Sequence, residues 1–299
     1  MKIYLSLISL DAMLTSRRLT LADSPALAAD HGFEGVEILD RQISGLDDDG
    51  LGKFHQICRR FGCGVVVDAG CDLTVPGQEA VERELSHLRR VIDQASILGC
   101  TTVRLAIGGQ RLSIQKLNRR NRPSGPAGGK YKRTVMSSAW VRRAGYLYRS
   151  RWANHAKYAE PVFRSAIEAL CRILPYAGER GISLAIENHW GISSRPEWIM
   201  RILKGVDAAN IGTCPDFGNF ASRADRYAGI AMLAPAALHV QAKCWSFRSD
   251  GEERTIDFGR CMGILKDAGY DGTVAVEYEG GGDELSACIN ARQLILRSL

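Results

Sequence analysis

The sequence predicts an α/β protein built as a single (β/α)8 barrel. Three observations lead to this fold class: short β-branched runs recur along the chain, helical patterns follow them, and 299 residues suit one barrel of about 250 residues with an insertion. The composition, 45% hydrophobic and 24% charged, excludes disordered and fibrous classes. We find no run of about 18 uninterrupted apolar residues, so we predict no membrane-spanning helix.

Eight runs have the composition of strands. They are rich in Val, Ile and Leu without strict polar alternation, which favours strands buried on both faces of a parallel sheet. Charged residues follow the first run without a small-residue cleavage pattern, so we interpret it as a strand and not as a secretion signal. The predicted strands are Lys2–Ser9, Gly35–Leu39, Gly64–Asp68, Thr102–Ile107, Ile182–Glu187, Asn210–Cys214, Ala237–Gln241 and Gly272–Glu277.

Helical patterns lie between the predicted strands. Apolar residues recur at helical spacing in Glu79–Leu98, Pro161–Arg180 and Phe258–Ala268, and a glycine follows each of them. The run Ser194-Arg195-Pro196-Glu197 has a capping-box signature, which predicts a further helix through Leu203. A doubly wound open sheet is the structural alternative, but no Gly-x-Gly-x-x-Gly follows the first strand.

A basic segment follows the fourth predicted strand. Residues 111–157 contain thirteen Lys or Arg and no Asp or Glu; since the whole chain carries +6, the remainder carries −7. Six Tyr or Trp lie between residues 131 and 158, more than a solvated loop needs. We therefore expect a single domain over residues 1–299 in which 111–157 is an inserted lid or subunit interface. A solvated excursion is the alternative.

Nine cysteines are present, and none lies in a Cys-x-x-Cys pair. This pattern predicts reduced thiols in a cytoplasmic protein and disfavours a zinc site made of cysteines. Cys63, Cys100, Cys171 and Cys214 lie within apolar stretches. We expect them in the core.

Polar residues gather near the carboxyl ends of the predicted strands, where barrel enzymes place their chemistry. Glu187, Asp216 and Glu277, with Gln241 as a neutral oxygen donor, would form an oxygen-rich pocket that a divalent cation could occupy. Salt bridges at the barrel rim are the alternative interpretation. The full set comprises Glu37, Asp68, Arg104, Glu187, His189, Asp216, His239, Gln241, Lys243, Glu277 and Glu279.

Four motifs occur in order at the spacing of a barrel. They are Ile186–Gly191, Pro215–Phe220, His239–Lys243, and Gly269–Gly272 with Val276–Gly280. Through them, residues 182–280 resemble the sugar phosphate isomerase/epimerase superfamily, the xylose-isomerase-like TIM barrels. The first hundred residues fit this family more loosely.

The resemblance implies one divalent metal ion held by Glu187, Asp216, Gln241 and Glu277. The family often has histidine where this chain has Gln241, two residues before the lysine. An amide oxygen is a harder ligand, so we favour Mn²⁺ or Mg²⁺, with Zn²⁺ or Co²⁺ as alternatives. His189 and Lys243 match positions that usually face the sugar.

We therefore predict a sugar isomerase/epimerase that abstracts a proton α to a carbonyl through a metal-bound enediolate. Glu187 and Glu277 would move the proton, and Lys243 would stabilise the developing oxyanion. The expected substrate-binding residues are His189, Arg104, His239 and Glu279, although His239 could instead be a packed core histidine.

Several alternatives remain open. A lyase or dehydratase could act on a keto-sugar or keto-glycoside through the same enolisation. An AP-endonuclease-like phosphodiesterase, or a non-catalytic assembly subunit, would belong to other classes. The expected partners are a small sugar or keto-sugar and further copies of the chain in a homo-oligomer, with no membrane partner and nucleic acid disfavoured.

Overall fold

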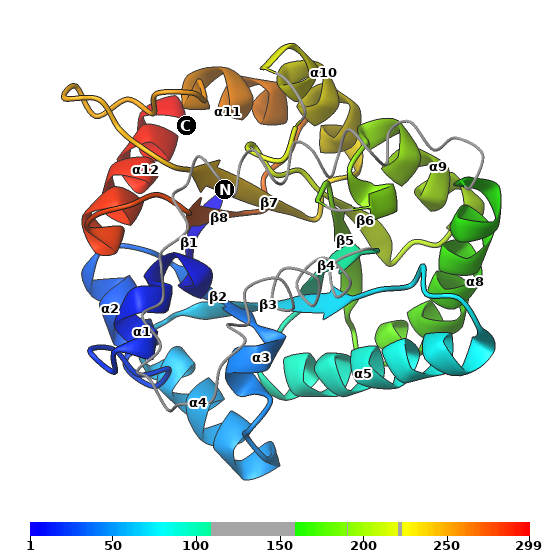
Figure 1. The fold of residues 1–299 in the computed structure, drawn as a ribbon. Helices are drawn as coiled ribbons and strands as arrows, with labels where there is room; N and C mark the ends of the chain where they lie inside the picture. Colours follow the sequence, from blue (N-terminus) through cyan, green and yellow to red (C-terminus); the bar gives the residue numbers. More distant parts are fainter. Residues whose placement is uncertain (109–158, 190, 221–222) are drawn as a thin grey trace, which may run out of the picture.

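The protein is a TIM barrel, as the sequence predicted. The computed structural model describes residues 1–108, 159–189, 191–220 and 223–299, and the basic segment 111–157 therefore lies outside the described residues. Eight parallel strands surround one axis, with helices outside them (Figure 1). The strands are β1 (Lys2–Ser6), β2 (Gly35–Leu39), β3 (Gly64–Cys71), β4 (Thr102–Ile107), β5 (Ser183–Glu187), β6 (Ile211–Cys214), β7 (His239–Cys244) and β8 (Thr273–Tyr278).

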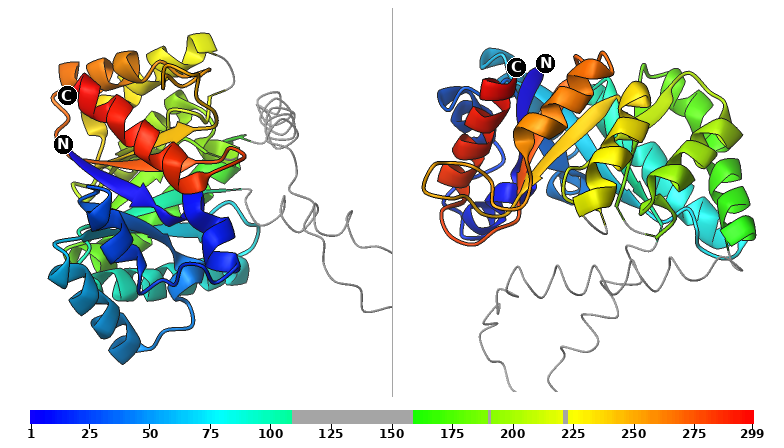
Figure 2. Two further views of the ribbon diagram at one scale, coloured as in Figure 1. Left: turned by 90° about the vertical axis from the view of Figure 1, so that its left-hand side faces the viewer. Right: turned by 90° about the horizontal axis from the view of Figure 1, so that it is seen from above.

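The helices cover the outside of the barrel (Figure 1, Figure 2). Each long helix turns an apolar stripe toward the strands; Leu85, Leu88 and Ile92 in one of them are fully buried. The two chain termini lie at the same end of the barrel in Figure 2. The described helices are α1 (Asp11–Thr15), α2 (Ser24–Asp30), α3 (Asp40–Ile43), α4 (Asp48–Arg60), α5 (Gln78–Ile97), α8 (Ala159–Gly178), α9 (Pro196–Val206), α10 (Arg223–Leu233), α11 (Phe258–Asp267) and α12 (Glu284–Ser298).

The barrel closes between β6 and β7 through isolated bridges instead of a continuous ladder. Thr213 pairs with Ala237, and Asp216 pairs with Gln241, so the register shifts by one residue between the two bridges. Pro215 lies within this shift and has no N–H to donate. The Gln241 N–H donates to the Pro215 carbonyl at 2.9 Å, and the Phe217 N–H donates to the Gln241 carbonyl at 2.9 Å. The closure therefore aligns Asp216 with Gln241.

Two local predictions need correction. The first strand ends at Ser6 and not at Ser9, because residues 7–10 form a 3-10 turn. The capping box is wrong as well: Arg195 is the N-cap residue of α9, and the Ser194 hydroxyl donates to the Gly191 carbonyl at 2.8 Å. Proline favours the first position of a helix and forces the residue before it into extended backbone, so Pro196 determines where α9 begins.

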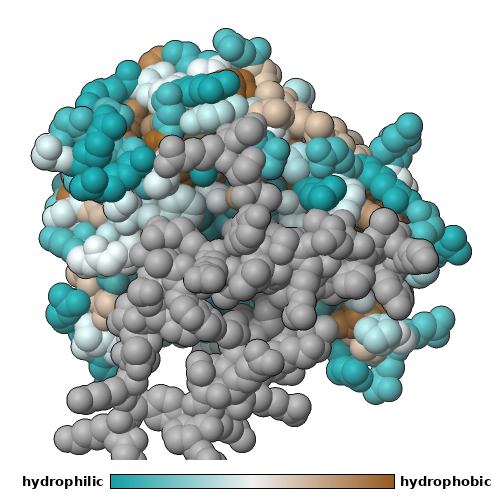
Figure 3. Space-filling model, turned by 45° about the horizontal axis from the view of Figure 1, so that its top comes forward, coloured by the Kyte–Doolittle hydropathy of each residue, from teal (hydrophilic) through white to brown (hydrophobic). Residues whose placement is uncertain are grey.

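The surface that faces the viewer in Figure 3 is mainly hydrophilic wherever it is coloured, and its hydrophobic residues are scattered. Among the described helices, none combines the length and the apolar character that crossing a bilayer demands.

Tyr4 fills the amino-terminal end of the barrel between β2 and β3. A Cβ atom added at Gly64 would lie 1.9 Å from the Tyr4 hydroxyl oxygen, and one added at Gly35 would lie 2.4 Å from the ring. Burial raises the pKa of Tyr4 to about 12, so the phenol stays neutral. Glycine at both positions is therefore a packing requirement of this ring.

We predict that Gly64→Ala destabilises the protein by about 1–3 kcal/mol, the usual cost of overpacking a core. Gly263→Ala in α11 is the matched control, since an added Cβ atom there would meet no atom within 4 Å. Alanine suits a helix better than glycine, so the control should be neutral or stabilising. Denaturant unfolding measures both; equal stability of the two variants would contradict the packing argument.

Candidate functional site

Three carboxylates, contributed by β5, β8 and the segment after β6, meet inside the carboxyl end of the barrel. Glu187 is the last residue of β5, Asp216 follows β6, and Glu277 lies near the end of β8. All three are buried, and each offers an oxygen such that these atoms lie within 4.8 Å of one another. Gln241 in β7 is also fully buried and is bridged to Asp216 through the main chain.

The Asp216 carboxylate is fixed by the loop that follows it. Its Oδ1 accepts hydrogen bonds from the main-chain N–H groups of Gly218 at 2.5 Å and Asn219 at 3.0 Å. The Asn188 side chain makes two hydrogen bonds to the main chain of Asp216. Its Oδ1 accepts from the Asp216 N–H at 2.7 Å, and its Nδ2 donates to the Asp216 carbonyl at 3.1 Å. These contacts leave Oδ2 turned away from the loop, 3.5 Å from Lys243 Nζ.

Both oxygens of Glu187 receive hydrogen bonds. Arg104 Nη1 donates to Oε2 at 2.6 Å, and Asn219 Nδ2 donates to Oε1 at 3.1 Å. Burial raises the pKa of Glu187, Arg104 opposes that shift, and the nearby Asp216 and Glu277 carboxylates add to it. The hydrogen bonds from Arg104 and Asn219 therefore fix the orientation of the Glu187 carboxylate.

Glu277 is held less tightly. Lys243 Nζ lies 3.1 Å from its Oε1, whereas its buried Oε2 has no hydrogen-bond partner among the described residues. Burial raises the pKa of Glu277 to about 8, with Lys243 opposing and Glu279 adding to the shift. Burial alone would lower the pKa of Lys243, but Asp216 and Glu277 raise it, so the amine stays charged.

Gly218 leaves room for Lys243. A Cβ atom added at Gly218 would lie 2.7 Å from Cδ of Lys243 and 2.6 Å from the Trp245 ring. The lysine stem therefore passes directly over the loop that fixes Asp216, which brings its ammonium group to the carboxylates.

The donor set fits a hard divalent cation. Asp216 Oδ2, Gln241 Oε1 and Glu277 Oε2 are buried acceptors without a hydrogen-bond partner within the described chain. Buried polar atoms are rarely left unpaired, because their desolvation is then uncompensated. Carboxylate and amide oxygens are the ligands that Mg²⁺ and Mn²⁺ prefer. Glu187, Asp216, Gln241 and Glu277 are therefore the residues that would hold such an ion.

A second set of polar residues lies deeper in the barrel than we predicted. Glu37, Asp68 and Arg104 lie in the middle of β2, β3 and β4, not at the strand ends. Arg104 contacts Glu37 at 3.2 Å, Asp68 at 2.8 Å and Glu187 at 2.6 Å. Burial raises the pKa of Glu37, but Arg104 and His239 outweigh it and lower that pKa to about 2. Burial raises the pKa of Asp68 to about 6.

Two residues predicted to bind substrate are occupied by protein partners. Arg104 is 3% exposed and pairs with three carboxylates. His239 is fully buried; its Nδ1 is 2.7 Å from Thr273 Oγ1, and its Nε2 is 2.8 Å from Glu37 Oε2. We propose that both hold carboxylates in position instead of contacting substrate.

The other two predicted substrate-binding residues follow strand ends. The main-chain N–H of His189, two residues beyond β5, donates to the Ser193 carbonyl at 3.2 Å. The N–H of Glu279, directly after β8, donates to the Cys244 carbonyl at 3.0 Å, and its side chain lies 3.5 Å from Lys243 Nζ. Substrate binding by these two residues stays a prediction.

Sequence reasoning assigned no role to Asn188, Asn219 or Ser6. The two asparagines position Asp216 and Glu187, and the Ser6 hydroxyl donates to Glu37 Oε1 at 2.7 Å. A usable signal was present for the asparagines. Each lies within three residues of a predicted ligand, at the ends of consecutive strands.

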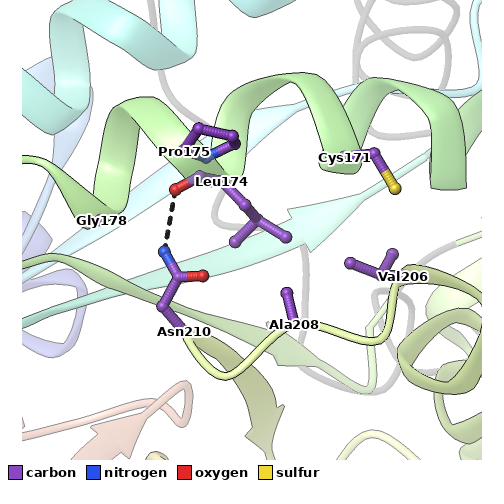
Figure 4. A pocket seen from close by; sticks show the side chains of 7 residues that line it. All are labelled: Cys171, Leu174, Pro175, Gly178, Val206, Ala208 and Asn210. Carbon is purple, nitrogen blue, oxygen red and sulfur yellow. Dashed lines mark hydrogen bonds between the residues drawn. The ribbon is translucent and has the colours of Figure 1, made fainter.

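A separate surface pocket of about 310 Å³ lies between α8 and the segment that leads into β6 (Figure 4). Asn210 Nδ2 donates to the Leu174 carbonyl across it at 2.9 Å. Asn210 precedes β6, so this pocket belongs to the amino-terminal end of the barrel, away from the carboxylates. Cys171 lines the pocket and is exposed, which corrects its predicted core position; the other eight cysteines are buried, and all nine are free thiols.

The family follows from a comparison with known protein families. Residues 25–297 match the model of the xylose isomerase-like TIM barrel. The chain belongs to this family. This agrees with the resemblance found in the sequence motifs.

Several solved structures share the fold of this xylose isomerase-like protein at low sequence identity. An L-ribulose 3-epimerase superimposes with a TM-score of 0.70 at 15% identity, covering 100% of this chain and 94% of the other. A D-allulose 3-epimerase from Methylomonas sp. in complex with D-allulose gives 0.70 at 13% identity, covering 100% and 97%. The IolI protein with a bound zinc atom gives 0.66 at 14% identity, covering 100% and 99%.

A curated relative matches only part of this family member. The uncharacterized protein MJ1311 of Methanocaldococcus jannaschii is 25% identical over 137 residues, which are 42% of this chain. The match spans 46% of that protein, slightly less than half of its length.

We predict that Mn²⁺ stabilises the protein more at about pH 8 than at about pH 6, because a metal ligand must lose its proton to bind. The pKa of Glu277 is about 8 in the folded protein and 4.5 in its ordinary state. Between these two pH values Glu277 is protonated in the folded metal-free protein and ionised in the unfolded chain. The stability of the metal-free protein therefore falls as pH rises through this range.

The measurement is the melting temperature of chelator-treated protein with and without Mn²⁺ across this pH range. Glu277→Gln is the control, since its side chain cannot titrate and the pH-dependent part of the Mn²⁺ effect should shrink. An equal or larger effect of Mn²⁺ at the lower pH in the unmodified protein would contradict the prediction.

Proposed function

We propose that this protein is a divalent-metal-dependent isomerase or epimerase of small keto-sugars. The observation that carries the proposal is the group of three buried acceptor oxygens, on Asp216, Gln241 and Glu277, that have no hydrogen-bond partner among the described residues. They lie beside Glu187 and Lys243, which supply a third carboxylate and a buried positive charge. Acids and a cation at the carboxyl end of a TIM barrel are suited to enolisation next to a carbonyl.

When bound, a divalent cation supplies positive charge that stabilises an enediolate and orients the adjacent oxygens. We favour Mn²⁺ or Mg²⁺ because every donor in the set is an oxygen. The remaining steps use the chain's own groups.

Glu277 is suited to move a proton as well as to hold the cation, because a carboxylate has two oxygens. Its Oε2 would face the cation, and its Oε1, 3.1 Å from Lys243 Nζ, would exchange the proton. Glu187 is suited to the complementary transfer from β5, with Arg104 and Asn219 fixing its direction. Return of a proton to the opposite face of the same carbon gives an epimer, and return to the neighbouring carbon gives an isomer.

Lys243 Nζ would donate to the oxygen on which negative charge develops. Its amine is held among Asp216, Glu277 and Glu279 and stays protonated, so it can act without moving. His189 and Glu279, beyond β5 and β8, would contact sugar hydroxyls. The sugars named for the epimerase structures support a small polyhydroxy ketone as the substrate class.

The test is incubation of metal-loaded protein with a panel of keto-sugars in deuterated water, followed by NMR and mass analysis. We expect deuterium at one carbon α to the carbonyl, with an epimer or isomer as product. Loss of a leaving group from the same sugar would identify a lyase. Absence of exchange across the panel with metal bound would reject the proposal.

We predict that Glu277→Gln and Glu187→Gln each lower turnover by at least about 10²-fold, the usual scale of general acid–base catalysis. Glu82→Gln, a carboxylate on α5 that pairs with Arg172 at the surface, is the control and should leave turnover unchanged. Metal content and deuterium exchange are measured on the same samples. Near-normal exchange by both variants would show that other groups move the proton.

A further inference from the structure

Glu37 collects four donors on one buried carboxylate. Ser6 Oγ donates to Oε1 at 2.7 Å, Arg104 approaches within 3.2 Å, and His239 Nε2 lies 2.8 Å from Oε2. Gln241 Nε2 also donates to Oε2. Glu37 is 1% exposed, so water does not compete for these contacts. An ionised carboxylate only accepts hydrogen bonds, which makes Glu37 a fixed acceptor for every partner.

This acceptor decides which way the Gln241 amide points. An amide has one donor end and one acceptor end, and reversing it would set two oxygens against each other. His239 reinforces the orientation. Thr273 Oγ1 lies 2.7 Å from its Nδ1, and its Nε2 lies 2.8 Å from the same Glu37 oxygen to which Gln241 donates.

The opposite end of the amide is the second observation. Gln241 Oε1 is buried and has no hydrogen-bond partner within the described residues. The main chain of Gln241 is bridged to Asp216, whose Oδ2 likewise has no hydrogen-bond partner in the described part of the chain. The contact with Glu37 therefore keeps the unsatisfied oxygen on the end of the amide away from Glu37, in a residue whose main chain adjoins the candidate ligand Asp216.

We propose that Glu37 is a positioning residue that locks the Gln241 amide with its oxygen toward the cation, and that the chain thereby makes a neutral side chain serve as its fourth ligand. The inference rests on the proposed function, because it presumes that a cation binds. Glu37 acts through Gln241 and touches neither substrate nor cation.

The test uses the full-length protein, stripped with chelator and titrated with Mn²⁺ under electron paramagnetic resonance. Glu37→Gln should weaken Mn²⁺ binding by about 10–100-fold, the usual effect of removing a group that orients a metal ligand. Glu37→Asp keeps the charge facing Arg104 but draws the carboxylate back from Gln241. It should show the same direction of change and carries the test if Glu37→Gln does not fold.

Two matched variants separate positioning from general damage. Ser6→Ala removes a donor from Glu37 Oε1 without touching the Gln241 contact, so Mn²⁺ affinity should stay within about threefold of the unmodified protein. When Gln241 is already replaced by Ala, adding Glu37→Gln should lower Mn²⁺ affinity by less than about threefold, because the amide that Glu37 orients is then absent. The Co²⁺ absorption spectrum should change alike in Glu37→Gln and Gln241→Ala and stay unchanged in Ser6→Ala.

The outcomes distinguish the two proposals. Tight Mn²⁺ binding by the unmodified protein with no loss in either Glu37 variant overturns the positioning role and leaves the proposed function standing. Losses that add fully in the Gln241→Ala background also overturn it. Failure of the unmodified protein to bind Mn²⁺ overturns both.

Discussion

The guanidinium of Arg104 joins three carboxylates that belong to β2, β3 and β5, and the arrangement of the site depends on it. Charges in a barrel interior are expensive unless each is paired and hydrogen-bonded. The planar guanidinium of arginine carries five N–H donors in a fixed arrangement, so it can face several carboxylates in defined directions. Removing it would leave Glu37, Asp68 and Glu187 buried without their shared counter-charge.

The buried charges form two levels with different tasks. In the deeper level, Arg104 pairs with Glu37 and Asp68, and His239 Nε2 contacts Glu37. In the upper level, Asp216, Gln241 and Glu277 each keep one oxygen without a hydrogen-bond partner among the described residues. Glu187 belongs to both levels, because Arg104 holds it from below while its carboxylate lies among the candidate ligands. The deeper residues thus support the upper ones, whose oxygens are available to a ligand, as expected where a rigid scaffold supports a reactive site.

The sequence was sufficient for the order of the elements and for the residues of the upper level. Continuous β-branched runs identified the strands, and charged residues at or just beyond their carboxyl ends identified Glu187, Asp216 and Glu277. The position of a side chain along the barrel axis could not be predicted from the sequence. Alternation with period two tells which side a residue faces but not how far a strand continues, and β3 and β7 extend beyond the predicted ends.

The remaining errors have specific causes. The capping box at Ser194 failed because Pro196 imposed its own start on α9. Cys171 was expected in the core because its neighbours are apolar, but its place on α8 faces outward. Each error is a case in which tertiary or stereochemical context outweighed a local pattern.

The shifted register between β6 and β7 links cylinder closure to ligand binding. Two bridges hold these strands together, and Asp216 and Gln241 form the one next to the carboxylates. Any ligand that binds both of these side chains therefore also stabilises the pairing of β6 with β7. By linkage, binding of that ligand makes local separation of the two strands less favourable. Amide protons of Phe217 and Gln241 would then exchange with solvent more slowly in the loaded protein, while the continuous β1–β5 ladders would serve as an internal reference.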